Sequence, residues 1–577
     1  MVDVDSNEMF LHSKDWCSMP KYKYPTKKQH GMDIFQSRSK SNSEKYEERN
    51  LYAGFGQDSL RRIVLLFCLA MAIRLLFLFL VVPICFDWDS YHHWQISYYT
   101  LHIGLQNGRM WDLTGMEYFW GILPELVQAF LLWAFGMREL LPFRLFNAFI
   151  GSVSTVLIYL VVRRYRKEKE AITASLLCSV MVTLVAWNVS GVNETLGIMF
   201  LLLSLFLYEE KSYLCGVSLG LASMCRIEYW ILSLGVLSCY LIFRRSSTDF
   251  VPSLFGWFTP MGPYFYCLWI WTGDFLYPLK LNYLASYYAW QKGEQPPLIV
   301  IPPESIPYKI LWTAIFVASA LLIFQIYRKE RSRYIAPDKS VLEALQNRRS
   351  GYIVPVFFLG FLMFQGATFV LSYRYLAGPW TLDWLVSPWS PGSLHDRPWM
   401  LNYVFVAILL AKAADKFAYL HIQKGAPRVE LRTDRISRTG CVFVAVFLVW
   451  LLAMVPAYHE LSVSSSGIKF WFGMADVVAD GYDGGTVIVE GPPMIVYELA
   501  QRGVPPRKVL SSFYSPKYYG GDEKQTLDWF RNLNATWYIH DPGSIIFPEL
   551  ASSKDWGPFL LYRQYGSFTI YQVKFTT

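Results

Sequence analysis

The sequence predicts a mainly α-helical protein, a polytopic bundle of about eleven transmembrane spans followed by a C-terminal extracytoplasmic α/β domain. The chain has 577 residues, of which 53% are hydrophobic and only 17% are charged. Its apolar residues come in blocks of roughly 20, the length that crosses the hydrocarbon layer. After about residue 458 the blocks give way to short strand-like and helix-like segments. Such a chain has too much apolar surface for one water-soluble core.

The number of spans follows from the apolar runs and the basic loops between them. The runs lie near residues 63–86, 119–136, 142–162, 171–187, 195–208, 213–225, 229–243, 253–272, 308–327, 352–372, 400–418 and 439–457. Loops rich in Lys and Arg are cytoplasmic, and those of this chain alternate consistently only if the run 119–136 does not cross. That run is short and contains Pro124, Glu125 and Gln128, so we expect a helix lying in the membrane interface.

The charge pattern also divides the chain into three parts. Residues 1–60 are polar and are predicted to be a disordered cytoplasmic tail. Residues 61–457 are predicted to form the transmembrane domain, which has an outer loop at 87–141 and contains the candidate catalytic residues, and residues 458–577 are predicted to form the outer domain. The net charge of +8 comes from short clusters between apolar runs, so it marks topology and predicts no nucleic-acid partner.

The outer domain is predicted from alternating short strands and helices. Expected strands lie at Thr486–Glu490, Lys508–Ser511 and Trp537–His540, and expected helices at 493–502 and 523–533. A hairpin is expected over 558–575, with Gly566 at its turn. This part contains no nucleophile elbow, P-loop or GxGxxG motif.

The first candidate site follows the first apolar run, where residues 86–94 read FDWDSYHHW. A hydroxyl becomes a useful nucleophile when a base removes its proton, so Asp87 and Asp89 are the candidate catalytic bases. His92 and His93 are candidate substrate contacts, metal ligands or interfacial residues. The alternative interpretation is a solvated helix end.

A second candidate site combines acids with aromatic rings further along the outer loop. Rings pack on the C–H faces of sugars while carboxylates bind hydroxyl groups, so this segment suits a sugar. The substrate-binding candidates are Trp111, Asp112, Glu117 and Trp120. An aromatic belt at the membrane surface would produce a similar pattern.

Cations near the outer surface are few, and each is a candidate phosphate contact. Arg226 lies between two apolar runs, where a cation is costly unless it is paired or used. It is therefore either a substrate contact together with Glu228 or the partner of Glu228 in an ion pair. Arg374 and Arg397 lie in an outer loop. Arg74, inside the first run, is expected to bind a buried acid or carbonyl group and to hold helices together.

Together these motifs resemble the GT-C superfamily of membrane glycosyltransferases, which includes dolichyl-phosphate glucosyltransferases and oligosaccharyltransferase catalytic subunits. The resemblance covers roughly residues 60–457. It rests on the acidic motif DWDSYHHW at 87–94, the short second outer loop WNVSGVNE at 187–194, and GDFLYP at 273–278. It implies a polyprenyl-phosphate-sugar donor and a first-loop acid that acts as base.

Departures from the superfamily narrow the expected reaction. The Asp-Glu pair of protein O-mannosyltransferases and the Trp-Trp-Asp signature of oligosaccharyltransferases are absent. We therefore expect transfer of a single sugar to a lipid-linked glycan or protein acceptor. The resemblance implies no cofactor, although the spacing of Asp87 and Asp89 leaves a divalent metal open. The expected location is the plasma membrane of a prokaryote or the endoplasmic-reticulum membrane.

Several alternatives stay open at this point. A transporter or flippase would also have many spans, but no internal repeat is visible. A membrane scaffold would tolerate loss of Asp87 and Asp89, and an oligosaccharide ligase would use a diphosphate-linked donor. Asn188, Asn193 and Asn534 lie in glycosylation sequons. The sugar, the acceptor, the stereochemistry, the lipid length, the oligomeric state and the identity of the base are not determined by the sequence.

Overall fold

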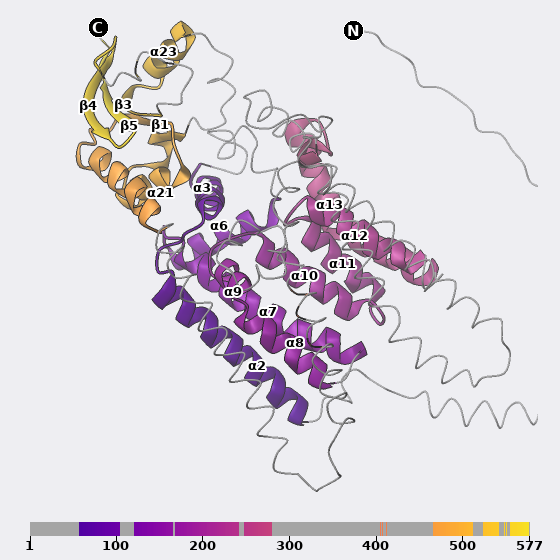
Figure 1. Ribbon diagram of the computed structural model, residues 1–577. Coiled ribbons are helices and arrows are strands. Elements are labelled where there is room, and N and C mark those ends of the chain that lie inside the picture. The colour runs from indigo at the N-terminus through magenta and orange to yellow at the C-terminus, as the bar shows by residue number, and fades with distance from the viewer. Residues whose placement is uncertain are drawn as a thin grey trace, which may run out of the picture. The chain divides into compact units, whose positions relative to one another are not determined.

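The computed structural model describes residues 57–103, 121–165, 168–241, 247–279, 465–511, 523–541 and 554–575, with the single positions 404, 407, 411, 547 and 550 (Figure 1). The chain divides into two compact units, Met1–Arg62 and Ile63–Thr577. The predicted disordered tail lies almost entirely outside the described residues. The predicted boundary between the catalytic and outer domains stays a prediction.

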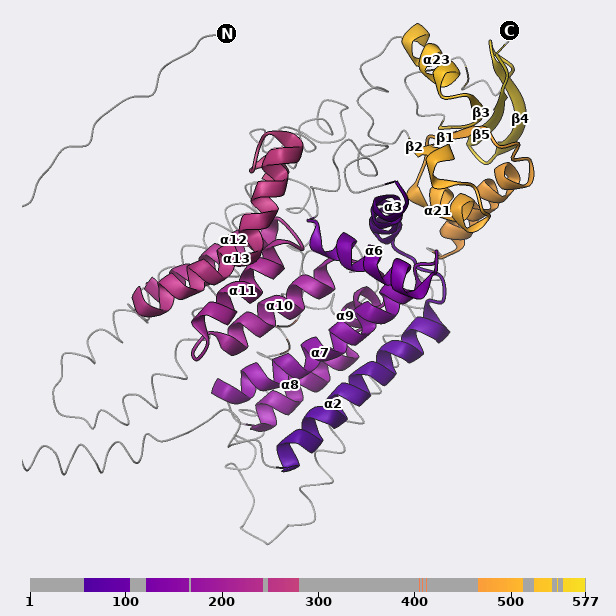
Figure 2. The same cartoon turned by 180° about the vertical axis from the view of Figure 1, so that it is seen from behind.

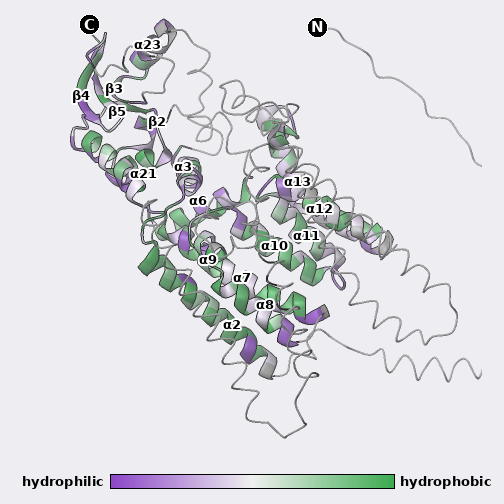
Figure 3. Cartoon of the chain, viewed as in Figure 1, coloured by the Kyte–Doolittle hydropathy of each residue, from purple (hydrophilic) through white to green (hydrophobic). Residues whose placement is uncertain are grey.

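Helices account for all regular structure between residues 57 and 272 of the described part, and Figure 2 shows them from the opposite side. The helices are α2 (Gln57–Leu76), α3 (Trp88–His102), α6 (Leu123–Phe135), α7 (Leu141–Tyr165), α8 (Glu168–Val180), α9 (Val182–Asn188), α10 (Glu194–Leu207), α11 (Ser212–Ser223), α12 (Glu228–Cys239) and α13 (Ser247–Thr272). A π-helical turn, Phe77–Val81, continues α2. Hydrophobic residues cover most of α2, α7 and α10 (Figure 3).

The predicted apolar runs up to residue 272 correspond to these helices, except that the run 171–187 is divided between α8 and α9. The number of spans is not tested. Two stretches within the described residues are long and apolar enough to cross a membrane, Ser59–Val81 and Leu141–Arg164. The runs after residue 279 lie outside the described residues except at three positions. Helix α6 has 13 residues, which gives a length of about 20 Å. It is too short for the roughly 30 Å hydrocarbon layer, as predicted.

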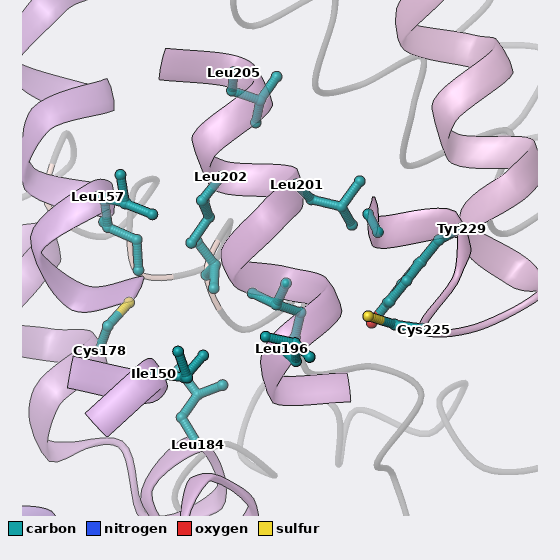
Figure 4. Close-up of a cluster of buried hydrophobic side chains, with 14 of the residues drawn as sticks. Ile150, Leu157, Cys178, Leu184, Leu196, Leu201, Leu202, Leu205, Cys225 and Tyr229 are labelled. Atoms are coloured by element: carbon teal, nitrogen blue, oxygen red, sulfur yellow. The ribbon is translucent and has the colours of Figure 1, made fainter. Parts of the chain in front are cut away.

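The helices pack through a continuous apolar core, part of which is drawn in Figure 4. The side chains of Leu157, Cys178 and Leu202 come from α7, α8 and α10 and point toward one another. Helices α11 and α13 approach closely at glycines. A Cβ at Gly216 would lie 1.8 Å from the Ser253 carbonyl oxygen, so this contact requires a residue without a side chain.

The C-terminal part contains the predicted α/β structure. The strands are β1 (Thr486–Val489), β2 (Val509–Ser511), β3 (Ala535–His540), β4 (Phe559–Tyr565) and β5 (Phe568–Val573), in the order β2-β1-β3-β5-β4. Helices α21 (Pro493–Gln501) and α23 (Glu523–Asn532) separate the first three strands, which are parallel. Gly566, with φ of +62°, forms the turn between the antiparallel strands β4 and β5. All the predicted strands, helices and the hairpin are confirmed within two residues.

The two faces of this sheet are buried in different cores because side chains alternate along each strand. Ile488 and Tyr538 face one core, which also contains Phe530 and Phe559. Val487 and Trp537 face the other core, which contains α21 and residues of α3, among them Tyr91, Trp94 and Tyr99. The sheet therefore packs, through α21, against the helix that carries the acidic motif.

Candidate functional site

The acidic motif forms the start of α3. Asp87 is the N-cap residue, with β-region backbone angles, and its Oδ2 accepts hydrogen bonds from Ser90 N at 2.8 Å and Ser90 Oγ at 2.6 Å. An acidic N-cap satisfies free amide groups of the first turn and also interacts well with the helix dipole. Asp89 lies in the first turn of α3 and is half-buried. The two candidate bases therefore differ in their local roles.

One face of α3 is aromatic and contacts the C-terminal part. The rings of Tyr91 and Trp94 lie 5.1 and 4.7 Å from that of Tyr497 on α21, in edge-to-face geometry. The Tyr99 hydroxyl donates to the Val509 carbonyl in β2 at 2.9 Å. Such ring pairs add stabilisation beyond their buried area. The orientation of α3 is thus fixed on this side by the α/β part of the chain.

The other face of α3 is polar and joins α6 and the second outer loop. His93 is fully buried, and its Nδ1 lies 2.9 Å from Glu125 Oε1 on α6. Asn193 Nδ2 donates to the same carboxylate oxygen at 2.9 Å. One turn further along α3, Ser97 Oγ donates to Gln128 Oε1 at 3.1 Å. Buried polar groups linked in this way rigidify their surroundings.

A second buried cluster continues from Asn193 to the Arg226 turn. Arg226 bonds Glu194 through Nη1 and Glu228 through both Nε, at 3.1 Å, and Nη2, at 2.7 Å. The backbone N–H of Leu123, at the start of α6, donates to the Met224 carbonyl. We call His93, Glu125, Asn193, Glu194, Arg226 and Glu228 the outer-face network, after the membrane face on which the sequence predicts them to lie. It brings together four segments that are far apart in the sequence.

Arg144 joins the segment before the acidic motif to the loop that contains Val189. Its guanidinium donates to the carbonyl groups of Val82, Pro83 and Val189, at 2.8 Å for the last two. These contacts tie the end of the first apolar run to the predicted second outer loop. Gly191 of that loop lies against Ser90, where a Cβ would be 3.2 Å from the serine Cβ. The second outer loop therefore packs directly against the capped start of α3.

His92 is held neutral beside Asp89. Burial, with a smaller contribution from His93, lowers the pKa of His92 to about 4, although Asp89 acts in the opposite direction. Its Nε2 accepts a hydrogen bond from Trp88 Nε1 at 3.1 Å, which places the ring proton on Nδ1. A neutral imidazole in this position can form hydrogen bonds, but it has no positive charge with which to attract a phosphate.

The predicted site residues are thus only partly brought together. Asp87, Asp89, His92 and His93 share α3, and His93 is linked through the outer-face network to Arg226 and Glu228. The remaining candidates, Trp111, Asp112, Glu117, Trp120, Arg374 and Arg397, lie outside the described residues. The ion pair of Arg226 with Glu228 was one of the two interpretations left open by the sequence, and it is confirmed.

Other expectations concern metals, glycans and Arg74. Among the described residues, no three His, Cys, Asp or Glu side chains form a group that could hold a metal ion. The sequon residues Asn188 and Asn193 are buried, whereas Asn534 is exposed in a left-handed turn. Arg74 donates to the Ala70 carbonyl at 3.1 Å and to Thr155 Oγ1 at 3.3 Å. The expected carbonyl contact and the link between helices are both confirmed.

Four functional candidates were missed by sequence reasoning: Glu125, Arg144, Asn193 and Glu194. Glu125 was noticed, but it was interpreted as a sign that its helix lies at the membrane surface. Asn193 was interpreted as a sequon. The available signal was a charged or amide group inside an apolar block, which requires a buried partner. The sequence does not indicate which segment supplies that partner.

Comparison with known proteins gives one family match. Residues 120–259 match the family model described as dolichyl-phosphate-mannose-protein mannosyltransferase. The matched segment contains Glu125, Glu194, Arg226 and Glu228, and it ends within α13. A search of curated proteins found no significant match.

Two solved structures show some likeness to this chain. ArnT from Cupriavidus metallidurans in the apo state is 14% identical with a TM-score of 0.47, covering 89% of this chain and 98% of that one. The Archaeoglobus fulgidus oligosaccharyltransferase tethered to an acceptor peptide is 12% identical with a TM-score of 0.42, covering 89% and 74%. At TM-scores below 0.5 these likenesses carry no argument about fold or site. The family match, by contrast, confirms the resemblance of this chain to the GT-C membrane glycosyltransferases, over the segment that supplies most of the outer-face network.

Proposed function

We propose that this protein transfers a single sugar from a polyprenyl-phosphate donor to a lipid-linked glycan or protein acceptor at the outer membrane face. The observation that carries the proposal is the connection of the acidic motif to the family-matched segment. Helix α3 begins with Asp87 and Asp89, and its buried His93 is bonded to Glu125 of that segment. The family description names a dolichyl-phosphate-linked sugar, which supports the donor class.

We assign the role of general base to Asp89 and a positioning role to Asp87. The Asp87 carboxylate already accepts two hydrogen bonds from Ser90 and is needed to cap α3. In the proposed reaction Asp89 takes the proton of the acceptor hydroxyl while the oxygen of that hydroxyl forms a bond to the sugar C1. The bond from C1 to the phosphate oxygen breaks, and the lipid phosphate leaves with the electron pair.

The outer-face network holds α3 in position for this chemistry. Its members are almost entirely buried, with Glu194 1% and Arg226 3% exposed. Because both carboxylates occupy the guanidinium, Arg226 cannot bind a phosphate without losing one of them. We therefore assign Arg226 and Glu228 to holding the turn beside α6, and we leave phosphate binding to Arg374 and Arg397. Trp111, Asp112, Glu117 and Trp120 remain the proposed sugar contacts. We propose His92 as a further contact, through a neutral hydrogen-bonding group.

The test is sugar transfer by the full-length protein in lipid nanodiscs with a panel of polyprenyl-phosphate sugars. We expect Asp89→Asn to lower kcat at least about 100-fold, because general base catalysis contributes roughly 10²–10⁴. Asp87→Asn is the matched control, since asparagine caps a helix as well as aspartate does. We expect it to keep most of the activity. Equal losses in the two variants, or full activity of Asp89→Asn, would overturn the assignment.

A parallel reaction with a metal chelator tests the open question of a divalent ion. If a base and cations supply the chemistry, the rate is unchanged by the chelator. Loss of transfer that added Mg²⁺ or Mn²⁺ restores would instead assign metal binding to the Asp87 and Asp89 motif.

A further inference from the structure

Three asparagines of this chain lie in Asn-X-Ser/Thr sequons, and the structure places them in different surroundings. Asn188 is 6% exposed and Asn193 is fully buried. Asn534 lies between α23 and β3 (Figure 1), and it is exposed. An N-linked glycan is bulky and soluble, so its asparagine has to reach solvent in the folded protein. Of the three, Asn534 alone meets this condition.

The two buried asparagines also use their amide groups in contacts between segments. Asn193 Nδ2, the atom to which a glycan would be attached, donates to Glu125 Oε1 at 2.9 Å. Asn188 Oδ1 accepts from Thr195 Oγ1 at 3.2 Å. Its Nδ2 packs against α7, where a Cβ on Gly151 would lie only 2.6 Å away. A sugar on either nitrogen would break these contacts, so the folded protein has no room for a glycan at these two positions.

The backbone around Asn534 is fixed, whereas its side chain is left for solvent. Helix α23 ends at Asn532. The N–H of Asn534 donates to the Arg531 carbonyl, and its carbonyl accepts from Thr486 N–H, both at 3.0 Å. Its φ of +50° is the left-handed conformation that often follows a helix and that asparagine tolerates. The side-chain amide makes no hydrogen bond with a described residue, so its nitrogen is available for modification.

The threonine of the same sequon is also compatible with a glycan. Thr536 lies in β3 and is half-buried, and its Oγ1 donates to Asp483 Oδ1 at 2.8 Å. Neither this bond nor the left-handed turn uses the amide nitrogen of Asn534. A substituent on that nitrogen therefore extends into solvent and costs the fold none of these contacts.

We propose that Asn534 carries an N-linked glycan when the chain is inserted into the endoplasmic-reticulum membrane, and that Asn188 and Asn193 stay unmodified. The donor is a polyprenyl-diphosphate-linked oligosaccharide, used by the cell's own oligosaccharyltransferase. Asn534 Nδ2 gives a proton to a base of that enzyme and forms a bond to C1 of the first sugar. The bond from C1 to the diphosphate oxygen breaks, and the lipid diphosphate leaves with the electron pair. The proposal is independent of the transferase chemistry above, but it rests on the predicted outer location of the α/β part.

The test is the gel mobility of the full-length protein made in eukaryotic cells, before and after treatment with a peptide N-glycosidase. A second form has a C-terminal tag with an Asn-Gly-Thr sequon, which reports the side of the membrane on which the α/β part lies. We expect one glycan on the untagged protein and two on the tagged protein. After the treatment, mass spectrometry should find aspartate in place of Asn534, because the enzyme hydrolyses the side-chain amide, and unchanged Asn188 and Asn193.

Variants of the sequon locate the modification. Thr536→Ala should remove the glycan, because a sequon requires a hydroxyl residue two positions after its asparagine. Thr536→Ser is the matched control, since it keeps the sequon and a hydroxyl group for Asp483. Asn534→Asp removes the amide but keeps a residue that tolerates the left-handed turn, so this variant decides if Thr536→Ala does not fold.

Three results would overturn the proposal, each for a different reason. A glycan on the tag but not on Asn534 would show that the exposed turn is not modified. The absence of both glycans would place the α/β part on the cytoplasmic side, against the predicted topology. A glycan on Asn188 or Asn193 would contradict the argument from burial. Each result is obtained without a sugar-transfer assay, so it is distinct from a failure of the proposed function.

Discussion

The same two polar arrangements occur in the outer-face network and in the C-terminal α/β part, with different surroundings. Arg226 bridges two carboxylates with a side chain that is 4% exposed, whereas Arg502 bridges Asp476 and Glu498 with 48% exposed. Each of the two parts also contains a His–Glu pair. The nitrogen–oxygen distance is 2.9 Å between His93 and Glu125 in the network and 3.0 Å between His540 and Glu490 in the α/β part. The network joins four separate segments, whereas His540 and Glu490 lie at the ends of two paired strands.

This difference shows that the local geometry of a polar group does not reveal its role. A buried bridge between four segments links its members to the position of α3, the helix that carries the acidic motif. A pair within a sheet is supported by the backbone hydrogen bonds of its strands. We therefore expect changes in the network to alter transfer, and the equivalent changes in the α/β part to alter local stability only.

The largest effect is expected from Arg226→Met. It leaves Glu194 and Glu228 buried without their cation, so the free energy of unfolding should fall by about 3–5 kcal/mol. Arg502→Met is the matched control, and we expect little change because its side chain is half exposed to solvent. Denaturant titration of both proteins in mixed micelles measures the two values. Similar changes would show that burial does not distinguish the two bridges.

Lowering the pH should reduce the stability of the protein through His92 of α3. Its pKa lies near 4 in the folded protein and near 6.5 when unfolded. The unfolded state therefore binds more protons between these values, and stability falls as pH is lowered through this window. The full penalty, about 3 kcal/mol, is reached below pH 4.

His92→Gln should remove this contribution of His92 to the loss of stability in acid, while it keeps an acceptor for Trp88 Nε1. The measurement is the difference in Tm between pH 7.5 and pH 5, which should be larger for the wild type than for the variant. Equal differences would mean that burial of His92 does not contribute to the acid sensitivity.

A smaller effect is expected from Glu125→Gln, which keeps an acceptor for Asn193 Nδ2 but removes the charge beside His93. Loosening α3 should reduce kcat about tenfold, equivalent to about 1.4 kcal/mol. Glu490→Gln is the matched change in the α/β part and should leave kcat unaltered. A comparable loss of transfer in both variants would indicate that the α/β pair also positions the site.

Much of the fold of the described residues could be predicted because hydrophobic periodicity and turn residues are local signals. The strands predicted at 486–490 and 537–540 are found within two residues of those bounds, and the Gly566 turn and the shortness of the helix beginning at Leu123 are also confirmed. The outer-face network could not be predicted, because periodicity identifies the buried face of a helix but not the segment packed against it. Glu125 has the same appearance in the sequence whether it faces lipid headgroups or His93.

The position of the α/β part illustrates the same limit. Tyr91 and Trp94 lie within the motif that was interpreted through its acids and histidines, and nothing local indicates that their rings contact Tyr497, about 400 residues later. The sequence shows the acids and histidines of this motif, but it does not show which side chains its aromatic rings contact.

The central claim is tested most directly by following a labelled sugar during incubation of the wild-type protein with polyprenyl-monophosphate or polyprenyl-diphosphate donors and a membrane extract as acceptor. We predict that the label moves from the monophosphate donor to a glycan or protein, and that the diphosphate donors are not used. Transfer from diphosphate donors alone would contradict the donor class and favour a ligase. Label that stays on the lipid with every donor would contradict the claim that this protein is a glycosyltransferase.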